Sequence, residues 1–320
     1  MLTVSENAAK MRTANSEQPN SVLKILVCYH KPYTIPPLDN GVFIPIHVGK
    51  ALSNIILDMQ TDSQVNDQPC DNISKKNDTY CELTAMYWAW KNLRKLYPDV
   101  KYIGLFHYRR FLAFRKLPLA SAESRPERDI ANYRIKPQEI IRTLEAGKII
   151  VPSRMHFPYS VATQYCVCHM SEDYRNTKDV IRTKFPDYYD DFVHVMEHSN
   201  KGTFCNMFVM KYDDFEKYCE WLFAVLAEIE PLVPYHYYST YQKRVLAFIA
   251  ERLFNVYIRK NKLQAVYSSV CYYGGEKRKS TLRNLCRNLH HTLHSFKNGL
   301  AFSIQNTSAQ SLIKKFLPSS

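Results

Sequence analysis

Short apolar runs that end in polar residues recur along the chain. Residues 23–28 (LKILVC) and 101–106 (KYIGLF) are the clearest, and residues 148–152, 205–210 and 263–268 follow the same pattern. Apolar runs of about four to eight residues bounded by polar ones are typical of buried strands. We therefore expect buried strands in these five segments.

Between these runs, apolar residues recur at the spacing of a helix. The most regular helix is expected to begin near Asp78 or Thr79, one of which would be its N-cap, with Glu82 in the first turn. Its apolar positions are Leu83, Met86, Tyr87, Trp90 and Leu93. Further helices are expected from Pro137 to Gly147, from residue 171 towards residue 185, over residues 215–226 and over residues 242–258.

Strands and helices thus alternate, which is typical of an α/β fold around a mostly parallel central sheet. In such sheets, ligands bind beyond the carboxyl ends of the strands. Two polar clusters stand at such ends: His30 and Lys31 follow the first strand, and residues 107–110 (HYRR) follow the second. The sequence therefore predicts a ligand site where these clusters meet.

The composition is that of a globular protein with an anionic partner. Of 320 residues, 46% are hydrophobic and 23% are charged, which allows a large core. The 43 basic and 30 acidic residues give a formal net charge of +13. Such an excess predicts a phosphorylated ligand, a nucleic acid or an anionic membrane as the partner.

The sequence also predicts a cytoplasmic location. The nine cysteines include no C-x-x-C pair, and the first twenty residues are polar and lack the apolar core of a signal peptide. No apolar run approaches the roughly 18–20 residues that a membrane-spanning helix needs. We therefore expect a reducing compartment and no transmembrane segment.

Three segments differ in composition. Residues 1–21 are polar and expected to be disordered, and residues 22–270 carry the alternating pattern of the predicted catalytic domain. Residues 271–320 are rich in Lys and Arg, with leucines interleaved at helical spacing. A basic amphipathic segment is typical of binding to an anionic membrane surface. We expect this tail to place the protein peripherally on the inner face of the cell membrane.

Arg109 and Arg110 are candidates for binding a diphosphate. Guanidinium groups hold phosphates through paired hydrogen bonds and stay charged at any working pH. Many nucleotide-sugar enzymes of this architecture instead hold a divalent metal with an Asp-x-Asp motif, which this chain lacks. We therefore expect no metal cofactor, with a divalent metal as the alternative. Equally, both arginines could pair with surface or core carboxylates.

Glu251 is a carboxylate in an otherwise apolar helical segment, between Ala250 and Arg252. Adjacent residues on a helix do not face each other, so Arg252 is not expected to be its partner. Two alternatives stay open: Glu251 pairs with another element, or it is functional. Glu82, near a helix start, is explained by the helix dipole alone.

Several longer motifs occur in an order that is similar to a known family. They are residues 29–32 (YHKP), 45–49 (PIHVG), 71–74 (DNIS), 80–92 (YCELTAMYWAWKN), 104–111 (GLFHYRRF), 206–210 (NMFVM), 218–223 (YCEWLF), 241–244 (YQKR) and 251–254 (ERLF). Over residues 23–268 the chain resembles the bacterial capsular and exopolysaccharide synthesis family once known only as a domain of unknown function. Its members are understood as galactofuranosyltransferases.

The resemblance implies a GT-A-like fold that binds a nucleotide sugar. It further implies transfer of galactofuranose from UDP-galactofuranose to a growing cell-surface polysaccharide or a polyprenyl-diphosphate-linked glycan. A β-linked product from an α-linked donor requires inversion. An inverting transfer needs a carboxylate that accepts the proton of the acceptor hydroxyl.

The resemblance also assigns roles by position. It implies that His30 and Lys31 bind the donor at the first strand end, and that Glu251 is the catalytic base. The diphosphate would be held by His107, Arg109 and Arg110, with Tyr108 between them. The other donor-binding residues that it implies are Asp71, Asn72, Tyr80, Glu82 and Asn206.

Other functions compete with this interpretation. A transferase of galactopyranose or another hexose would use the same kind of site. The net charge and many tyrosines would also suit a non-catalytic nucleic-acid-binding protein, but the chain has no motif for one and its basic residues gather beside leucines in the tail. A carbohydrate-binding module would need neither a base nor a diphosphate site.

Overall fold

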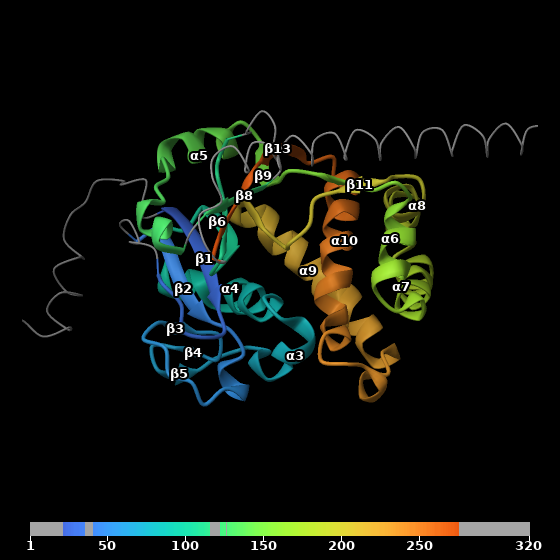
Figure 1. The fold of residues 1–320 in the computed structure, drawn as a ribbon, viewed down its shortest axis with the longest axis horizontal. Helices are drawn as coiled ribbons and strands as arrows, with labels where there is room; N and C mark the ends of the chain where they lie inside the picture. Colours follow the sequence, from blue (N-terminus) through green and yellow to red (C-terminus); the bar gives the residue numbers. More distant parts are fainter. Residues whose placement is uncertain (1–21, 36–40, 116–121, 126, 275–320) are drawn as a thin grey trace, which may run out of the picture.

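The computed structural model describes residues 22–35, 41–115, 122–125 and 127–274. Its centre is a sheet whose strands are ordered β13 (Gln264–Ser268), β9 (Lys148–Pro152), β12 (Phe208–Lys211), β6 (Tyr102–His107), β1 (Leu23–Tyr29), β2 (Phe43–His47) and β3 (Gln60–Thr61) (Figure 1). Strand β1 is parallel to β2 and β6, β2 is parallel to β3, and β13 is parallel to β9. The predicted α/β fold with a mostly parallel sheet is confirmed.

Strand β12 runs against its neighbours. It pairs antiparallel with both β6 and β9. An antiparallel strand begins at the edge where its neighbours end, so the residues just before β12 lie beside the carboxyl end of β6. Cys205 and Asn206, predicted to be part of this strand, form a turn ahead of it with φ angles of 80° and 48°.

Three more strands branch from the same sheet at β6. Strand β7 (Arg110–Leu112) turns back on β6, and β14 (Val270–Tyr273) pairs antiparallel with β7 and parallel with β8 (Ala122–Arg125). The sheet thus includes residues 271–273, which the sequence assigned to the basic tail, so the predicted boundary at residue 270 is too early. Residues 1–21 and 275–320, predicted as a disordered segment and a basic tail, lie outside the described residues.

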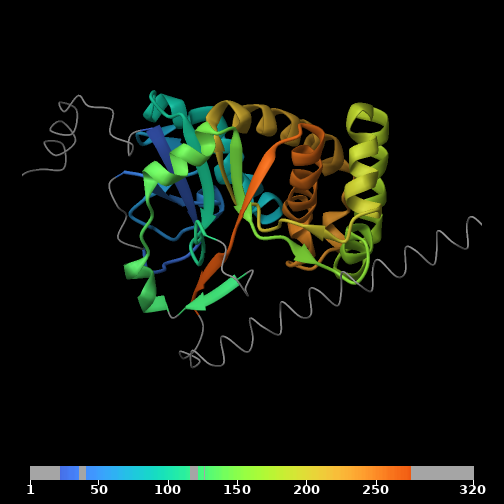
Figure 2. The same ribbon diagram turned by 90° about the horizontal axis from the view of Figure 1, so that it is seen from above.

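Helices cover both faces of the sheet (Figures 1 and 2). One face packs against α4 (Leu83–Leu96), α9 (Tyr212–Ile229) and α10 (Val245–Lys260), and the other against α5 (Pro137–Glu145). The alternation along β1 explains this, because Leu26 and Cys28 enter the first core while Ile25 and Val27 enter the second. The core is therefore built on both faces of β1.

A group of helices packs beside α10, at the end of the molecule away from β2 (Figure 1). They are α6 (Val161–Cys168), α7 (Ser171–Lys184) and α8 (Tyr189–Glu197). The sequence predicted α7 but neither α6 nor α8, which are short, with eight and nine residues. The expected helices α5, α9 and α10 are confirmed. Among the residues that the structure describes, no helix is long and apolar enough to cross a membrane.

The helix predicted to begin near Asp78 is interrupted. A short helix, α3 (Asn77–Tyr80), ends before Cys81, whose φ of 49° breaks the helical path, and α4 begins after Glu82. The amide of Asn77 stabilises the break by donating to the Cys81 carbonyl oxygen at 2.7 Å and to Thr84 Oγ1 at 3.1 Å. Glu82 therefore occupies the N-cap position of α4 and not a first helical turn.

Gly49 fixes how close α3 comes to β2. Its φ is 69°, and a Cβ atom there would lie 2.6 Å from Asn77 Oδ1. The hydrogen bonds of Asn77 prevent this side chain from moving aside. Only glycine therefore combines this backbone conformation with this approach.

We predict that Gly49→Ala destabilises the protein more than Gly147→Ala does. Gly147 has a similar φ of 75°, but a Cβ there would meet no atom within 4 Å. Gly147→Ala should cost about 1–2 kcal/mol for the left-handed backbone, and Gly49→Ala should add about 1–3 kcal/mol for the overlap. Urea unfolding of both variants measures the difference, and equal losses would show that Asn77 moves away without cost.

Candidate functional site

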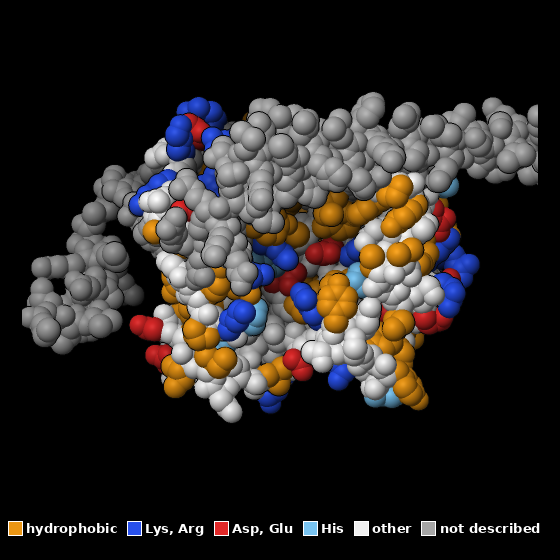
Figure 3. All heavy atoms as spheres, in the orientation of Figure 1, with side chains coloured by type: hydrophobic (Ala, Val, Ile, Leu, Met, Phe, Trp, Pro, Cys, Tyr) orange, Lys and Arg blue, Asp and Glu red, His pale blue; other side chains and the backbone are white. Residues whose placement is uncertain are grey.

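The carboxyl ends of β1 and β6 border a cleft of about 620 Å³. Figure 3 shows a hollow on this face in which basic, acidic and hydrophobic side chains lie together. Its walls come from β1, the α3–α4 junction, the β6–β7 turn and the segment before α10. The lining residues are Cys28, His30, Val48, Asn77, Asp78, Cys81, Glu82, His107, Tyr108, Arg109, Arg110, Thr240, Lys243 and Arg244.

A tight hairpin brings the predicted residues 107–110 to the cleft. His107 and Arg110 are paired across the turn between β6 and β7, with Tyr108 and Arg109 at its tip. Paired residues in an antiparallel hairpin project from the same face, so His107 and Arg110 lie side by side. His107 Nε2 lies 2.6 Å from the Cys205 carbonyl oxygen, which ties the hairpin to the turn before β12.

Basic side chains surround the ring of Tyr108 at the tip of the hairpin. Its ring lies edge-on to His30 at 5.1 Å, with Lys31 Nζ at 5.8 Å and the Arg109 guanidinium at 5.5 Å from the ring centroid. Burial lowers the pKa of His30, and Lys31, Arg244 and Arg109 lower it further. This wall of the cleft therefore favours an anionic ligand.

Glu251 lies behind this wall on α10, with 19% of its side chain exposed. Its Oε1 accepts the N–H of Cys205 at 2.9 Å, and its Oε2 accepts Arg252 Nη1 at 2.9 Å. Burial raises the pKa of Glu251, and the negative charge of Glu82 raises it further, although Arg252 and Arg110 oppose this effect. The carboxyl group is thus more basic than an exposed glutamate.

The expectation that Arg252 does not pair with Glu251 is wrong. The arginine side chain is long enough to fold back along the helix, where Nη1 also donates to the Phe248 carbonyl oxygen at 2.8 Å. Its Nη2 donates to Gln164 Oε1 on α6 at 2.8 Å. The rule that adjacent helical residues do not face each other therefore fails here, because other hydrogen bonds hold the long side chain of Arg252 in place.

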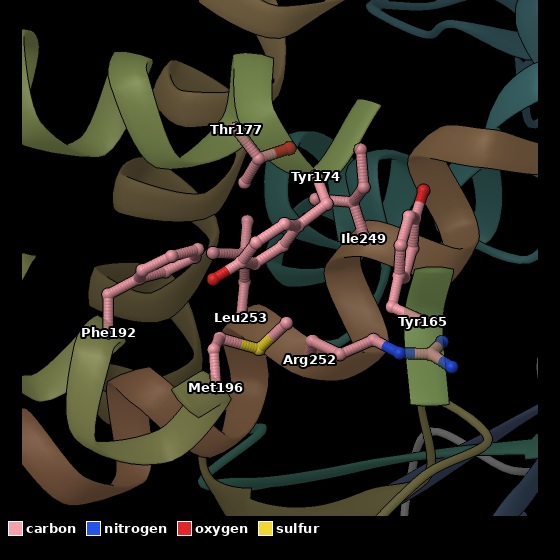
Figure 4. Close-up of a pocket in the computed structure, with 8 residues that line it drawn as sticks. All are labelled: Tyr165, Tyr174, Thr177, Phe192, Met196, Ile249, Arg252 and Leu253. Carbon is pink, nitrogen blue, oxygen red and sulfur yellow. The ribbon is translucent and has the colours of Figure 1, made fainter. Parts of the chain in front are cut away.

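Arg252, the partner of Glu251, also borders a small cavity (Figure 4). The cavity holds about 10 Å³, which is roughly room for one water molecule. Tyr165, Phe192 and Leu253 are among its mostly apolar lining residues, and they come from α6, α8 and α10. The helices around Arg252 are therefore closely packed and do not form a second ligand pocket.

Asn206 connects the turn before β12 to α10 and to Glu82, which lines the cleft. Its Nδ2 donates to Glu82 Oε1 at 2.8 Å and to the Ala247 carbonyl oxygen on α10 at 3.2 Å. Asn206, Cys205 and Cys81 all have positive φ angles, which non-glycine residues adopt at a cost. Strained backbone of this kind gathers at functional sites.

Five of the residues predicted to bind a donor are not among those that line the cleft: Lys31, Asp71, Asn72, Tyr80 and Asn206. Asp71 is exposed and accepts a hydrogen bond from Tyr87 at 3.1 Å. Asn72 donates to the Cys70 carbonyl oxygen and accepts the N–H of Ser74, as in a structural turn. Tyr80 is buried, and its hydroxyl donates to Glu230. The resemblance assigned Asp71, Asn72 and Tyr80 to donor binding by their motifs, but their side chains form structural hydrogen bonds outside the cleft.

Eight of the lining residues were not predicted as site residues, and three of these come from one segment. Thr240, Lys243 and Arg244 come from the segment that leads into α10. The motif at residues 241–244 and its two adjacent basic residues were the available signal. Arg244 Nε lies 3.2 Å from Cys81 Sγ, so this segment closes over the α3–α4 junction. Within the described ranges, no three His, Cys, Asp or Glu side chains are grouped as a metal site would require.

Comparisons with known proteins identify a family and a similar fold. The sequence matches a family described as a domain of unknown function, DUF4422, over residues 24–262. The fold is similar to the apo structure of the WbbM bifunctional glycosyltransferase, with a TM-score of 0.65 and 30% sequence identity. The similarity covers 80% of this chain but 46% of that protein, so this chain spans less than half its length. No curated protein matches the chain.

We predict that His107 makes the protein less stable in mild acid. Burial lowers the pKa of His107, and Arg110 lowers it further, although Glu82 opposes this effect. The unfolded chain therefore takes up the proton first, and the stabilisation is lost as the pH falls below about 6.5. His107→Gln keeps a donor for the Cys205 carbonyl oxygen but does not titrate.

Melting curves between pH 8 and pH 5 test this expectation. The melting temperature of the wild type should fall relative to that of His107→Gln as the pH decreases. His198→Gln, which changes an exposed histidine after α8, is the matched control and should follow the wild type. Parallel curves for the wild type and His107→Gln would contradict the prediction.

Proposed function

The chain belongs to the DUF4422 family, and on this premise we propose that it is a glycosyltransferase whose donor binds in the cleft. The observation that carries the proposal is the joining, at the carboxyl edge of the sheet, of a cationic wall with two carboxylates. A sugar transfer needs both, since the leaving diphosphate must be neutralised and the acceptor hydroxyl must lose its proton. The similar fold of a solved glycosyltransferase supports it.

We propose UDP-galactofuranose as the donor, with another UDP-hexose as the alternative. Arg109, Arg110 and Arg244 would hold the diphosphate, because all three line the cleft. His30 and Lys31 would extend this cationic wall around Tyr108. Glu82 and Asn206, which are hydrogen-bonded to each other, would face the sugar.

The proposed reaction inverts the anomeric carbon. The acceptor hydroxyl oxygen bonds to that carbon, the bond to the UDP oxygen breaks, and a carboxylate accepts the hydroxyl proton. Glu251 is the proposed base because it is held against the turn before β12 by the Cys205 N–H, and because burial raises its pKa. Glu82, which lines the cleft directly, is the second candidate.

The proposed acceptor is a growing cell-surface glycan, free or linked to a polyprenyl diphosphate. Residues 271–320 would hold the protein to the cytoplasmic face of an anionic membrane through their basic side chains, all of which lie beyond Gly274. This location would place the cleft near a lipid-linked acceptor.

We predict that Arg110→Ala weakens UDP binding about tenfold to a hundredfold. The loss corresponds to one charge-assisted hydrogen bond of about 1.5–3 kcal/mol. Arg115→Ala is the matched control, because it removes the same charge from an exposed site outside the cleft. Calorimetric titration with UDP in EDTA measures both variants. Binding by the wild type that requires Mg²⁺ or Mn²⁺ would contradict a diphosphate site made of arginines.

We predict that Glu251→Gln lowers turnover about 10²–10⁴-fold and leaves UDP affinity nearly unchanged. Glutamine keeps the shape and can still accept the Cys205 N–H, but it cannot take up the proton. Glu82→Gln is the parallel variant, and the melting temperature of each separates catalysis from folding. A larger loss in Glu82→Gln, with a Glu251→Gln enzyme that retains more than about a tenth of its activity, would transfer the role to Glu82.

A further inference from the structure

Tyr241 is an exposed aromatic side chain at the rim of the cleft. It is 54% exposed, yet its neighbours in sequence, Thr240, Lys243 and Arg244, line the cleft. Hydrophobic side chains border the hollow beside basic and acidic ones in Figure 3. An exposed aromatic ring at the edge of a polar cleft offers a flat surface on which a ligand can pack.

The ring of Tyr241 rests on two others. Its centroid lies 5.2 Å from that of Phe248 on α10 and 6.1 Å from that of His169, to which it is nearly parallel at 20°. His169 and Phe248 are themselves stacked at 4.1 Å. Both supporting rings are buried, so Tyr241 forms the outer surface of a rigid aromatic stack.

Hydrogen bonds hold this stack in place. Gln242 Oε1 lies 3.4 Å from His169 Nδ1, and Gln242 Nε2 donates to the Cys168 carbonyl oxygen at 3.1 Å. The guanidinium of Arg244 lies 5.4 Å from the centroid of Phe248 and also lines the cleft. Arg244 therefore contacts the stack and also belongs to the proposed diphosphate site. A ligand on Tyr241 would thus lie near the donor.

We propose that Tyr241 is a stacking platform for the terminal sugar of the acceptor. This inference rests on the proposed function. A sugar ring presents C–H groups on one face and hydroxyl groups at its edge, which suits a flat aromatic surface flanked by polar side chains. Several of the proposed donor contacts, among them Tyr108 and Arg109, come from the β6–β7 hairpin, whereas Tyr241 comes from the segment before α10. Arg244 of that segment would contact the diphosphate, so the acceptor sugar on Tyr241 would lie on the side of the cleft opposite the hairpin.

The uracil ring of the donor is the competing occupant, and the variants separate the two. Tyr241→Ala removes the platform, and Tyr241→Phe keeps the ring but removes the hydroxyl group. Tyr237→Ala is the matched control, because Tyr237 is 81% exposed and lies outside the stack and the cleft. Since the stack is formed by surface and buried rings, the melting temperature of each variant is measured first.

The first measurement is binding of simple sugars. With the full-length protein, both without UDP and with an excess of UDP, saturation-transfer NMR is recorded with methyl β-galactofuranoside and methyl α-galactopyranoside. We expect transfer to the sugar C–H protons in the wild type, Tyr241→Phe and Tyr237→Ala, and its loss in Tyr241→Ala. No transfer to either sugar in the wild type, or undiminished transfer in Tyr241→Ala, would overturn the proposal.

The second measurement is kinetic and separates this inference from the proposed function. Tyr241→Ala should raise the acceptor KM about three- to tenfold, as expected for loss of one aromatic stacking contact, with the Kd for UDP unchanged. A weaker Kd for UDP in Tyr241→Ala would assign the platform to the nucleotide and overturn the inference. A wild-type protein that binds no UDP and transfers no sugar refutes the proposed function, whereas the sugar-binding result still decides the role of Tyr241.

Discussion

The turn formed by Cys205 and Asn206 holds the site together. The Cys205 carbonyl oxygen lies against His107 of the hairpin, its N–H binds Glu251 of α10, and the Asn206 amide binds Glu82 at the start of α4. The turn can do this because β12 is antiparallel, so it begins at the edge where β6 ends. Two consecutive residues with positive φ have a conformational cost, which these contacts with three separate elements offset.

The electrostatics of the cleft depend on the same turn. Because the turn holds Glu82 and Glu251 close to each other, the negative charge of Glu82 raises the pKa of Glu251. Arg110, paired with His107 across the hairpin, lies close enough to both carboxylates to offset part of this repulsion. The cationic wall and the carboxylates are therefore not independent, because removing a charge from one changes the proton affinity of the other.

The sequence was sufficient where strand ends decide position. His30 and residues 107–110 were predicted to meet because both follow strands of a parallel sheet, and the structure places His30, His107, Tyr108, Arg109 and Arg110 in one cleft. It was not sufficient where a side chain depends on a local turn. Cys81 and Cys205 give no sign in sequence of their positive φ angles, so the break before α4 and the true start of β12 were missed. The pairing of Glu251 with Arg252 depends on a tertiary anchor, Gln164, that no helical spacing reveals.

The two arginines that act on Glu251 suggest how this base could become active only when the donor is present. Arg252 and Arg110 both lower the pKa of Glu251, but Arg252 is buried and committed to Phe248 and Gln164, whereas Arg110 lines the cleft. On the proposed function, a bound diphosphate would take up the positive charge of Arg110 and bring negative charge of its own. Both effects favour the protonated form of a nearby carboxyl group, so the proton affinity of Glu251 would rise when the donor occupies the cleft. The buried Arg252 would keep the carboxylate oriented throughout, whereas Arg110 would respond to the ligand. On the proposed function, these separate roles of the two arginines would couple donor binding to proton transfer.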